Sequence, residues 1–163
     1  MEILAPDPAD HVLEIGCGTG VAAGLILQKL TNGRLTAIDR SAAMIRAAER
    51  LNRASVASGM ARFWNVALEE AEFAGERFDK ILAVNVNRFW LKPADESGLW
   101  TPLLKPGGVV CLVYQPPPGQ STDRIVDGCS ESFQRSGFSE VQVLQAKHLD
   151  PPVVCIRASD YRS

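Results

Sequence analysis

The sequence lacks long hydrophobic runs and any large excess of charge of one sign. Apolar residues make up 46% of the 163 residues, but no apolar stretch reaches the length that crosses a membrane. The amino terminus carries Glu2, Asp7 and Asp10, which is unlike a signal peptide. The formal net charge of -2 excludes tight nucleic-acid binding by charge alone. We therefore expect a cytoplasmic protein without a membrane segment and without a nucleic-acid partner.

Cysteine and histidine are scarce and scattered. The four cysteines lie far apart: Cys17, Cys111, Cys129 and Cys155. They form neither a C-x-x-C pair nor a cluster with histidine, so we expect no metal site and reduced, mostly buried thiols. His11 precedes the first predicted strand, which places it at the end of the sheet away from the ligand-binding edge. His148 lies in a late loop, and neither histidine is well placed as a general base.

The stretch that organises the chain is Val12 to Gly20, with the sequence V-L-E-I-G-C-G-T-G. Its apolar start is typical of a strand buried on both faces of a parallel sheet. The three glycines allow a tight turn and the close approach of a ligand, and Val21 to Leu30 has a helical pattern. Strand, glycine loop and helix together predict a nucleotide-cofactor site, with a simple glycine-rich turn as the alternative.

Two residues indicate which cofactor this loop binds. The dinucleotide fingerprint G-x-G-x-x-G requires its third glycine at position 21, where the chain has Val21. Glu14 stands two residues before the first glycine, where a carboxylate repels a pyrophosphate but attracts a ligand that carries an ammonium and a sulfonium. This charge favours S-adenosylmethionine over NAD or NADP.

An acid follows the second predicted strand, Arg34 to Ile38. This residue, Asp39, lies about twenty residues past the glycine loop, where a carboxylate meets the ribose hydroxyls of an adenosine cofactor. Its two oxygens can accept two hydroxyl hydrogens. The alternative is a helix cap, a role that Ser41 could fill equally well for the predicted helix Ala42 to Asn52.

The motifs E-I-G-C-G-T-G and A-I-D-R-S-A-A-M-I resemble those of class I S-adenosylmethionine-dependent methyltransferases, in particular the small type 11 and type 25 domains. The resemblance extends over nearly the whole sequence. It implies an α/β, Rossmann-like sheet with strand order 3-2-1-4-5-7-6, the last strand antiparallel, and helices on both faces. It also implies that Glu14 holds the methionine amino group, that Asp39 binds the ribose, and that Arg40 and Met44 flank the adenine, although Met44 could equally belong to the helix core. The predicted cofactor-binding residues are Glu14, Gly16, Cys17, Gly18, Thr19, Gly20, Asp39, Arg40, Met44, Val66, Ala67 and Asn85.

The sequence departs from the family after the third predicted strand, Ala61 to Asn65. The family often has an acid before an alanine here, which accepts the adenine amino hydrogen, whereas this chain has Val66 before Ala67. The side-chain acceptor is therefore missing, and a backbone carbonyl, Asn65 or Glu69 has to replace it. The glutamates of this segment agree better with a solvated helix face.

Two further buried strands lead to the expected cleft. Phe78 to Val84 runs into the loop Asn85 to Trp90, and Val109 to Tyr114 ends beside it, at the edge where parallel sheets bind ligands. The loop lacks the Asn/Asp-Pro-Pro-Tyr sequence of the family's amino-group methylases, which argues against planar amide or exocyclic amine acceptors. We identify no catalytic residue. Asn87 and Tyr114 are the candidates for contact with the acceptor, and the alternative for the asparagines is to cap the following turn.

The remaining predicted elements are a short helix at Pro93 to Leu104, a helix at Thr122 to Ser136, and strands at Val141 to Leu144 and Pro152 to Arg157. All of them belong to one domain over residues 1–163, which has room for a single core.

We expect a methyltransferase that moves the methyl group of S-adenosylmethionine to a small-molecule acceptor and leaves S-adenosylhomocysteine. The alternatives are a non-catalytic S-adenosylmethionine-binding scaffold and an NAD(P)-dependent oxidoreductase, which Val21 and Glu14 oppose. The acceptor, its reacting atom and a homodimer stay open.

Overall fold

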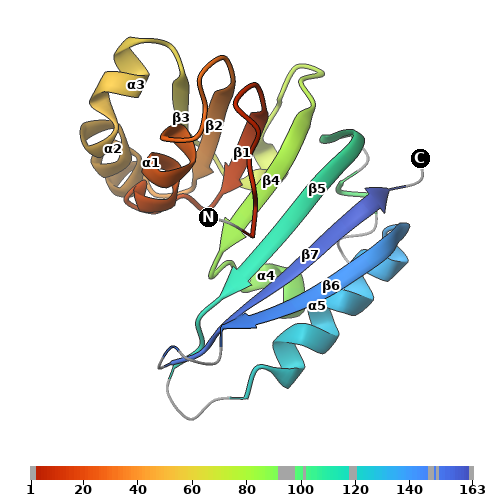
Figure 1. The fold of residues 1–163 in the computed structure, drawn as a ribbon. Coiled ribbons are helices and arrows are strands. Elements are labelled where there is room, and N and C mark those ends of the chain that lie inside the picture. The colour runs from red at the N-terminus through yellow and green to blue at the C-terminus, as the bar shows by residue number, and fades with distance from the viewer. Residues whose placement is uncertain are drawn as a thin grey trace.

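The computed structural model describes residues 3–91, 98–100, 102–117, 121–146, 149 and 151–161. Its centre is a sheet with the strand order β3-β2-β1-β4-β5-β7-β6 (Figure 1). The strands are β1 His11–Ile15, β2 Arg34–Asp39, β3 Ala61–Asn65, β4 Phe78–Val84, β5 Leu104–Tyr114, β6 Phe138–Ala146 and β7 Val153–Tyr161. The first five pair in parallel, and β7 is antiparallel to both of its neighbours. This order confirms the fold expected from the resemblance.

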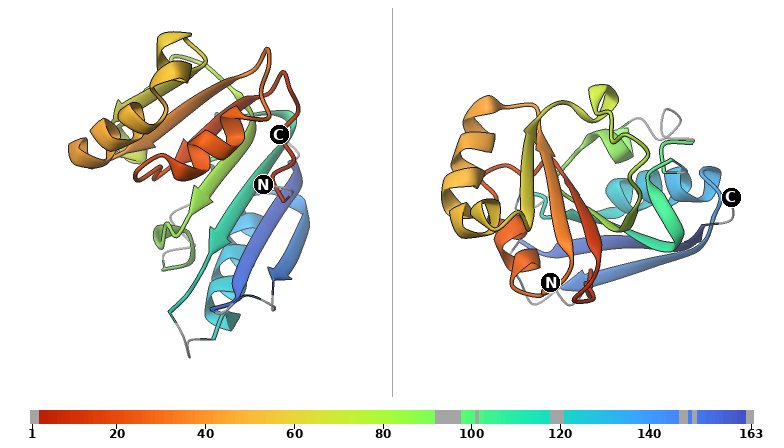
Figure 2. Two further views of the ribbon diagram at one scale, coloured as in Figure 1. Left: turned by 60° about the vertical axis from the view of Figure 1, so that its left-hand side comes forward. Right: turned by 90° about the horizontal axis from the view of Figure 1, so that it is seen from above.

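Helices cover both faces of this sheet (Figures 1 and 2). The helices are α1 Val21–Leu27, α2 Ala42–Leu51, α3 Arg53–Ala57, the 3-10 turn η1 Leu68–Glu70, α4 Arg88–Leu91 and α5 Asp123–Arg135. Side chains of α1 and α2 pack with one face of the strands, whereas those of α4 and α5 pack with the other. Successive residues of β1 point to opposite faces of the sheet. Val12 packs on the side of α1 and α2, and Leu13 packs on the side of α4 and α5.

Helix ends differ from the expected ones where local hydrogen bonds stop the helix. The helix expected over Val21 to Leu30 ends at Leu27, because the N–H groups of residues 31, 32 and 33 all turn to the carbonyl oxygen of Pro8. The helix expected to reach Asn52 ends at Leu51. The Asn52 side chain donates to the carbonyl oxygens of Gly20 and Ala48, both at 3.0 Å, so it links the end of α2 to the start of α1.

Elements in the carboxyl-terminal half also differ in length or type from those expected. Strands β6 and β7 are longer than expected, because their antiparallel ladder continues from the pair Phe138–Tyr161 to the pair Ala146–Val153. Helix α4 was expected as loop. Half of the helix expected over Pro93 to Leu104 falls outside the described residues. The described half is wrong as a helix, because residues 98–100 and 102–103 form turns and bends and Leu104 is the first residue of β5.

His11 and the four cysteines are all buried. His11 is buried at the amino end of β1, as expected, with its Nε2 atom 3.1 Å from Thr36 Oγ1. Burial, aided by Arg34, lowers the pKa of His11 to about 4. The four cysteines are buried and free, as expected, and His148 lies outside the described residues. Within the described ranges, no helix has the length and apolar character that a bilayer span requires.

Candidate functional site

The glycine loop between β1 and α1 is shaped by close backbone contacts. Gly16 has a φ of +70°, and its N–H donates to the Ile38 carbonyl oxygen at 2.9 Å, as the N–H of Cys17 does at 3.0 Å. A Cβ at Gly16 would lie 2.7 Å from Cγ2 of Val86, in the loop after β4. Only glycine therefore allows both the left-handed turn and the approach of the second loop. The two loops meet at the carboxyl edge of the sheet, as expected.

Asp39, the last residue of β2, ties this loop to its own strand. Its Oδ2 accepts a hydrogen bond from the Gly18 N–H at 2.9 Å, and its Oδ1 accepts from the Ser41 N–H at 2.8 Å. The cap of α2 is Ser41, whose Oγ accepts from the Met44 N–H at 3.4 Å. The cap role considered for Asp39 thus belongs to Ser41. A carboxylate offers about four acceptor positions, so Asp39 retains capacity for ligand hydroxyls.

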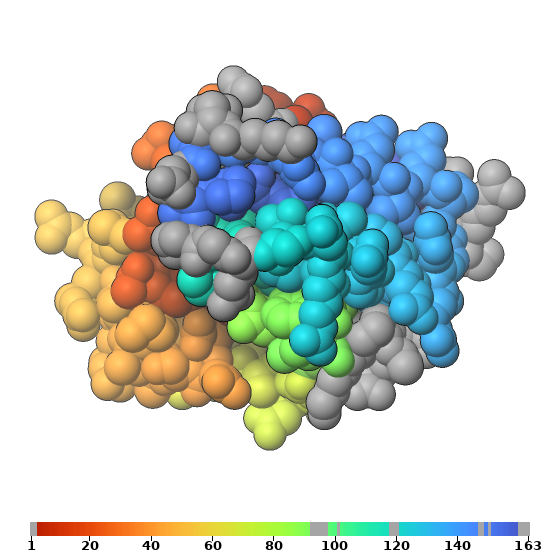
Figure 3. All heavy atoms as spheres, turned by 90° about the horizontal axis from the view of Figure 1, so that it is seen from below, coloured from red at the N-terminus to blue at the C-terminus, as the bar shows by residue number. Residues whose placement is uncertain are grey.

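A cavity of about 480 Å³ opens at the carboxyl ends of β1, β2, β3 and β4. Figure 3 views the molecule from this side. The predicted site residues that line the cavity are Gly16, Asp39, Arg40, Val66, Ala67, Asn85 and Asn87. Other predicted ones, all within the described part of the chain, do not line it: Glu14, Cys17, Gly18, Thr19, Gly20, Met44 and Tyr114. The wall thus comes from the strand ends and the loops that follow them.

Tyr114 does not face the cleft, contrary to expectation. Its side chain is 2% exposed and packs in the core beside α5, and its hydroxyl donates to the Val86 carbonyl oxygen at 2.8 Å. The phenol therefore supports the loop after β4 from inside. The side chain of the adjacent Gln115 also has a hydrogen-bond partner, since its Nε2 donates to the Pro151 carbonyl oxygen at 3.2 Å.

The two asparagines of the loop after β4 have different surroundings. Asn85 has a φ of 56°, and its Oδ1 accepts from the Gln115 N–H at 2.9 Å, which fixes it to the end of β5. Asn87 immediately precedes α4 and its carbonyl oxygen accepts from the Leu91 N–H at 3.1 Å. Its Oδ1 accepts from Trp90 Nε1 at 3.3 Å, so the side chain orders the start of α4 without bonding to the helix backbone.

Sequence reasoning left two possibilities for Glu69 and did not consider Arg88. Glu69 is exposed on the short helix η1, as a solvated helix face requires, and it also lines the cavity, as a replacement acceptor would. There its Oε1 forms an ion pair with Arg88 Nη1 of α4. Hydrophobic periodicity holds no signal for this pair, because it depends on how two short turns after different strands come together.

Glu14 lies behind the cavity wall. Its side chain is 2% exposed, and among the described residues no hydrogen-bond partner reaches its Oε2. Burial raises the pKa of the Glu14 carboxyl to about 8, and the nearby Asp39 carboxylate adds to the shift. The site therefore holds a buried carboxyl group whose protonated form is favoured.

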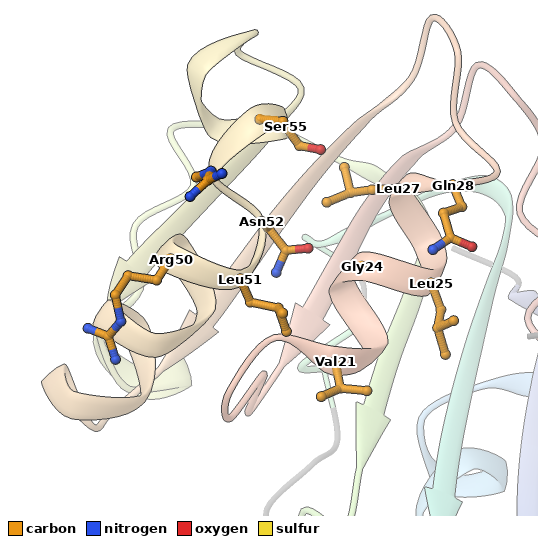
Figure 4. A pocket seen from close by; sticks show the side chains of 11 residues that line it. Val21, Gly24, Leu25, Leu27, Gln28, Arg50, Leu51, Asn52 and Ser55 are labelled. Atoms are coloured by element: carbon orange, nitrogen blue, oxygen red, sulfur yellow. The ribbon is translucent and has the colours of Figure 1, made fainter.

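A larger hollow of about 730 Å³ lies elsewhere, between α1 and the segment of α2 and α3 (Figure 4). Exposed apolar side chains, including Val21, Leu25 and Leu51, form much of its wall. None of its lining residues comes from a strand end or from the predicted site. The smaller cavity is thus the candidate site.

The sheet, the glycine loop and the acid after β2 define the architecture of class I methyltransferases. A solved structure with this fold is the precorrin-6y C5,15-methyltransferase of Geobacter metallireducens GS-15. The two chains superpose with a TM-score of 0.74 at 17% identity, over 96% of this chain and 83% of the other. At this identity the likeness concerns the fold.

Comparisons of sequence identify the family of the chain. An uncharacterized methyltransferase of Bacillus subtilis (strain 168), YdaC, is 26% identical over 155 residues, which are 91% of this chain and 82% of YdaC. The trans-aconitate 2-methyltransferase of Paracidovorax citrulli (strain AAC00-1) is 34% identical over 118 residues, 68% of this chain but 42% of that protein. Residues 12–108, more than half of the chain, match the methyltransferase domain family, to which the chain therefore belongs. This confirms the resemblance seen in the two motifs.

Replacement of Glu14 by Gln should remove a pH dependence of stability. The raised pKa means that folded Glu14 keeps a proton that the unfolded chain loses, so the free energy of unfolding falls as pH rises from 4.5 to about 8. The slope from one such group is at most about 1.4 kcal/mol per pH unit. Urea unfolding at several pH values in this range should show a shallower dependence for Glu14→Gln. The exposed Glu70→Gln is the control, and equal slopes in all three proteins would contradict the prediction.

Proposed function

We propose that the protein transfers the methyl group of S-adenosylmethionine to a small-molecule acceptor and releases S-adenosylhomocysteine. The observation that carries the proposal is the cavity in which Gly16, Asp39 and the loop after β4 meet at the carboxyl edge of the sheet. Membership of the methyltransferase domain family supports the reaction type and decides against the nicotinamide alternative.

The residues present fit this cofactor. Asp39 has acceptor capacity for ribose hydroxyls at the end of β2. The unpartnered Oε2 of Glu14 suits a cationic amino group nearby, because a positive charge favours ionisation of a buried carboxyl. Asp39 lines the cavity and the buried Glu14 lies behind its wall, so the two carboxyl groups at this end of the site agree with a ligand that carries positive charge there.

Methyl transfer depends more on the positioning of cofactor and acceptor than on acid or base catalysis. The sulfonium of the cofactor supplies an already activated methyl group, so in-line orientation and exclusion of water account for much of the required catalysis. The cavity wall contains Asp39 and Glu69 as carboxylates and no histidine or cysteine among the described residues. Asn87, exposed in the wall, orients the acceptor in this proposal, and Tyr114 holds the backbone of its loop.

The acceptor class is proposed from the charge of the wall. Its cationic side chains are the exposed Arg40 and Arg88, whose guanidinium is already paired with Glu69, so Arg40 is the first candidate for contact with an acceptor. A relative is named for methylation of trans-aconitate, whose carboxylates suit arginine. Small carboxylic acids are therefore the first acceptors to screen.

Cofactor binding should be visible as thermal stabilisation. S-adenosylmethionine or S-adenosylhomocysteine at about 100 times the dissociation constant should stabilise the protein by about 2.7 kcal/mol. NAD and NADP should leave the melting temperature unchanged. A shift with NAD alone would overturn the proposal.

Replacement of Asp39 by Ala should weaken binding of S-adenosylhomocysteine while the protein remains folded. Loss of charged hydrogen bonds to the ribose should cost about 1.5 to 3 kcal/mol of binding free energy. Ser41→Ala is the matched control, because it removes the α2 cap and about 1 kcal/mol of stability but leaves affinity intact. Calorimetry and melting curves of both variants test this. An equal loss of affinity in both would show that Asp39 acts only through the local fold.

Replacement of Asn87 by Ala should lower turnover and leave the affinity for S-adenosylhomocysteine unchanged, since Asn87 is assigned to the acceptor. The assay is methyl transfer to a panel of small carboxylic acids headed by trans-aconitate, with calorimetry of cofactor binding in parallel. Full activity of the variant on an accepted substrate, together with reduced stability, would instead assign Asn87 to ordering α4 alone.

A further inference from the structure

The sheet ends on one side in a long strand with little protection of its outer edge. Strand β6, Phe138–Ala146, is the last in the strand order, and among the described residues it pairs only with β7. Figure 1 shows it at the edge of the sheet, with α5 on one face. Its nine residues contain one charged side chain, Glu140, and no proline. Because proteins usually protect such edges with charge, proline, a bulge or short length, β6 is open to pairing.

The ladder between β6 and β7 is regular along this edge. Glu140 to Ala146 pair one by one with Ser159 to Val153, without the register shift that interrupts the pairing of β4 with β5. In an antiparallel strand, alternate N–H and C=O groups point away from the neighbouring strand. Within the described ranges, residues 140–145 form no backbone hydrogen bond beyond this ladder. The outward groups of this segment can therefore bond to a further strand.

Apolar side chains are exposed on both faces of this edge. Val143 pairs with Ile156, which belongs to the core on the side of α5, and Val143 is 42% exposed. Leu144 pairs with Cys155, which belongs to the core on the opposite side, and Leu144 is 40% exposed. A strand added beside β6 would cover both side chains, whereas a helix docked on one face would cover only one of them.

The opposite edge of the sheet is better protected. Strand β3 has only five residues and carries Arg62, whose side chain is 44% exposed and forms an ion pair with Glu76. The Arg62 guanidinium carbon also lies 3.8 Å from the centre of the Trp64 ring. A short strand with a charged side chain is a poor template for a further strand. The comparison identifies β6 as the edge that is available for pairing.

The edge of β6 is complementary to the same edge of a second copy. Two identical antiparallel edges pair about a two-fold axis, and each supplies the donors and acceptors that the other needs. With the axis at Val143, the two Val143 side chains face each other, and Glu140 faces Ala146 of the second copy. An axis at Gln142 places Val143 opposite Val141 instead. Neither register brings like charges together.

We propose that the protein forms a two-fold symmetric dimer in which the β6 strands of two copies pair antiparallel and join the two sheets into one. Pairing stops at two copies, because it uses the same edge of both. The candidate site lies at the ends of β1 to β4, and β5 and β7 separate it from β6. The interface therefore leaves the cavity of each copy open, and the inference does not depend on the proposed reaction.

The test is sedimentation velocity over a range of protein concentrations. Wild-type protein should sediment as a dimer at micromolar concentrations. Val143→Lys and Leu144→Lys each add a charge to both copies at the interface, so each should raise the dimer dissociation constant by about tenfold or more. The matched control is Leu25→Lys, at a leucine that is 44% exposed in the hollow beside α1. This control should leave the dissociation constant unchanged.

A cross-link locates the interface without relying on a destabilising variant. Facing residues of an antiparallel pair have Cα atoms about 4.5 to 5.5 Å apart, a separation that a disulfide can bridge. Mild oxidation should therefore give a covalent dimer of Gln142→Cys or of Val143→Cys, whichever lies at the axis. Ser58→Cys, exposed after α3, should give none, and the native cysteines are all buried.

Several results would overturn the proposal. Wild-type protein could sediment as a monomer throughout, or form assemblies that grow beyond two copies. A dimer that persists unchanged in both β6 lysine variants would exclude this edge, and loss of the dimer in Leu25→Lys alone would assign the interface to the hollow beside α1. Where a lysine variant does not fold, as judged by circular dichroism, the absence of a cross-link in both cysteine variants would overturn the dimer.

Discussion

The carboxylate of Asp39 is the interaction on which the site depends. It accepts hydrogen bonds from the backbone of Gly18 and Ser41, so one side chain joins the glycine loop to the end of β2 and to the turn that begins α2. Hydrogen bonds to an ionised acceptor are stronger than those between neutral groups. Asp39 therefore fixes the conformation of the glycine loop beside the proposed cofactor, and it also lines the cavity itself.

The loop after β4, which forms the opposite wall of the cavity, is held in place by a hydrogen bond from a core side chain. The Tyr114 hydroxyl donates to the carbonyl oxygen of Val86, and Val86 in turn leaves no room for a side chain at Gly16. Asn85 adds a hydrogen bond to the end of β5 and adopts a left-handed conformation that asparagine tolerates better than most residues. The loop after β4 is thus clamped by strand ends on either side. Polar side chains on such a loop keep a defined place while remaining open to a ligand.

Much of the fold could be predicted, because buried parallel strands are short apolar runs between turn residues. The bounds of β3 and β4 are those expected from the sequence. The position of Tyr114 could also have been predicted, since it shares strand parity with Val110 and Leu112 and all three belong to the same core cluster. The partnership of Glu69 with Arg88 could not, because neither periodicity nor spacing specifies how two short turns approach each other across a cavity.

Electrostatics links the buried acid to the ligand proposed for the site. Glu14 and Asp39 are close enough for the Asp39 carboxylate to raise the pKa of Glu14 further, beyond the effect of burial. The raised pKa means that Glu14 favours its protonated form, which avoids the cost of a second negative charge buried beside Asp39. A cationic ligand would oppose both effects and lower the pKa of Glu14, and by linkage its binding would release a proton. A neutral or anionic ligand would leave that proton in place. The buried glutamic acid therefore makes the site sensitive to the charge of its ligand without direct contact with the cavity.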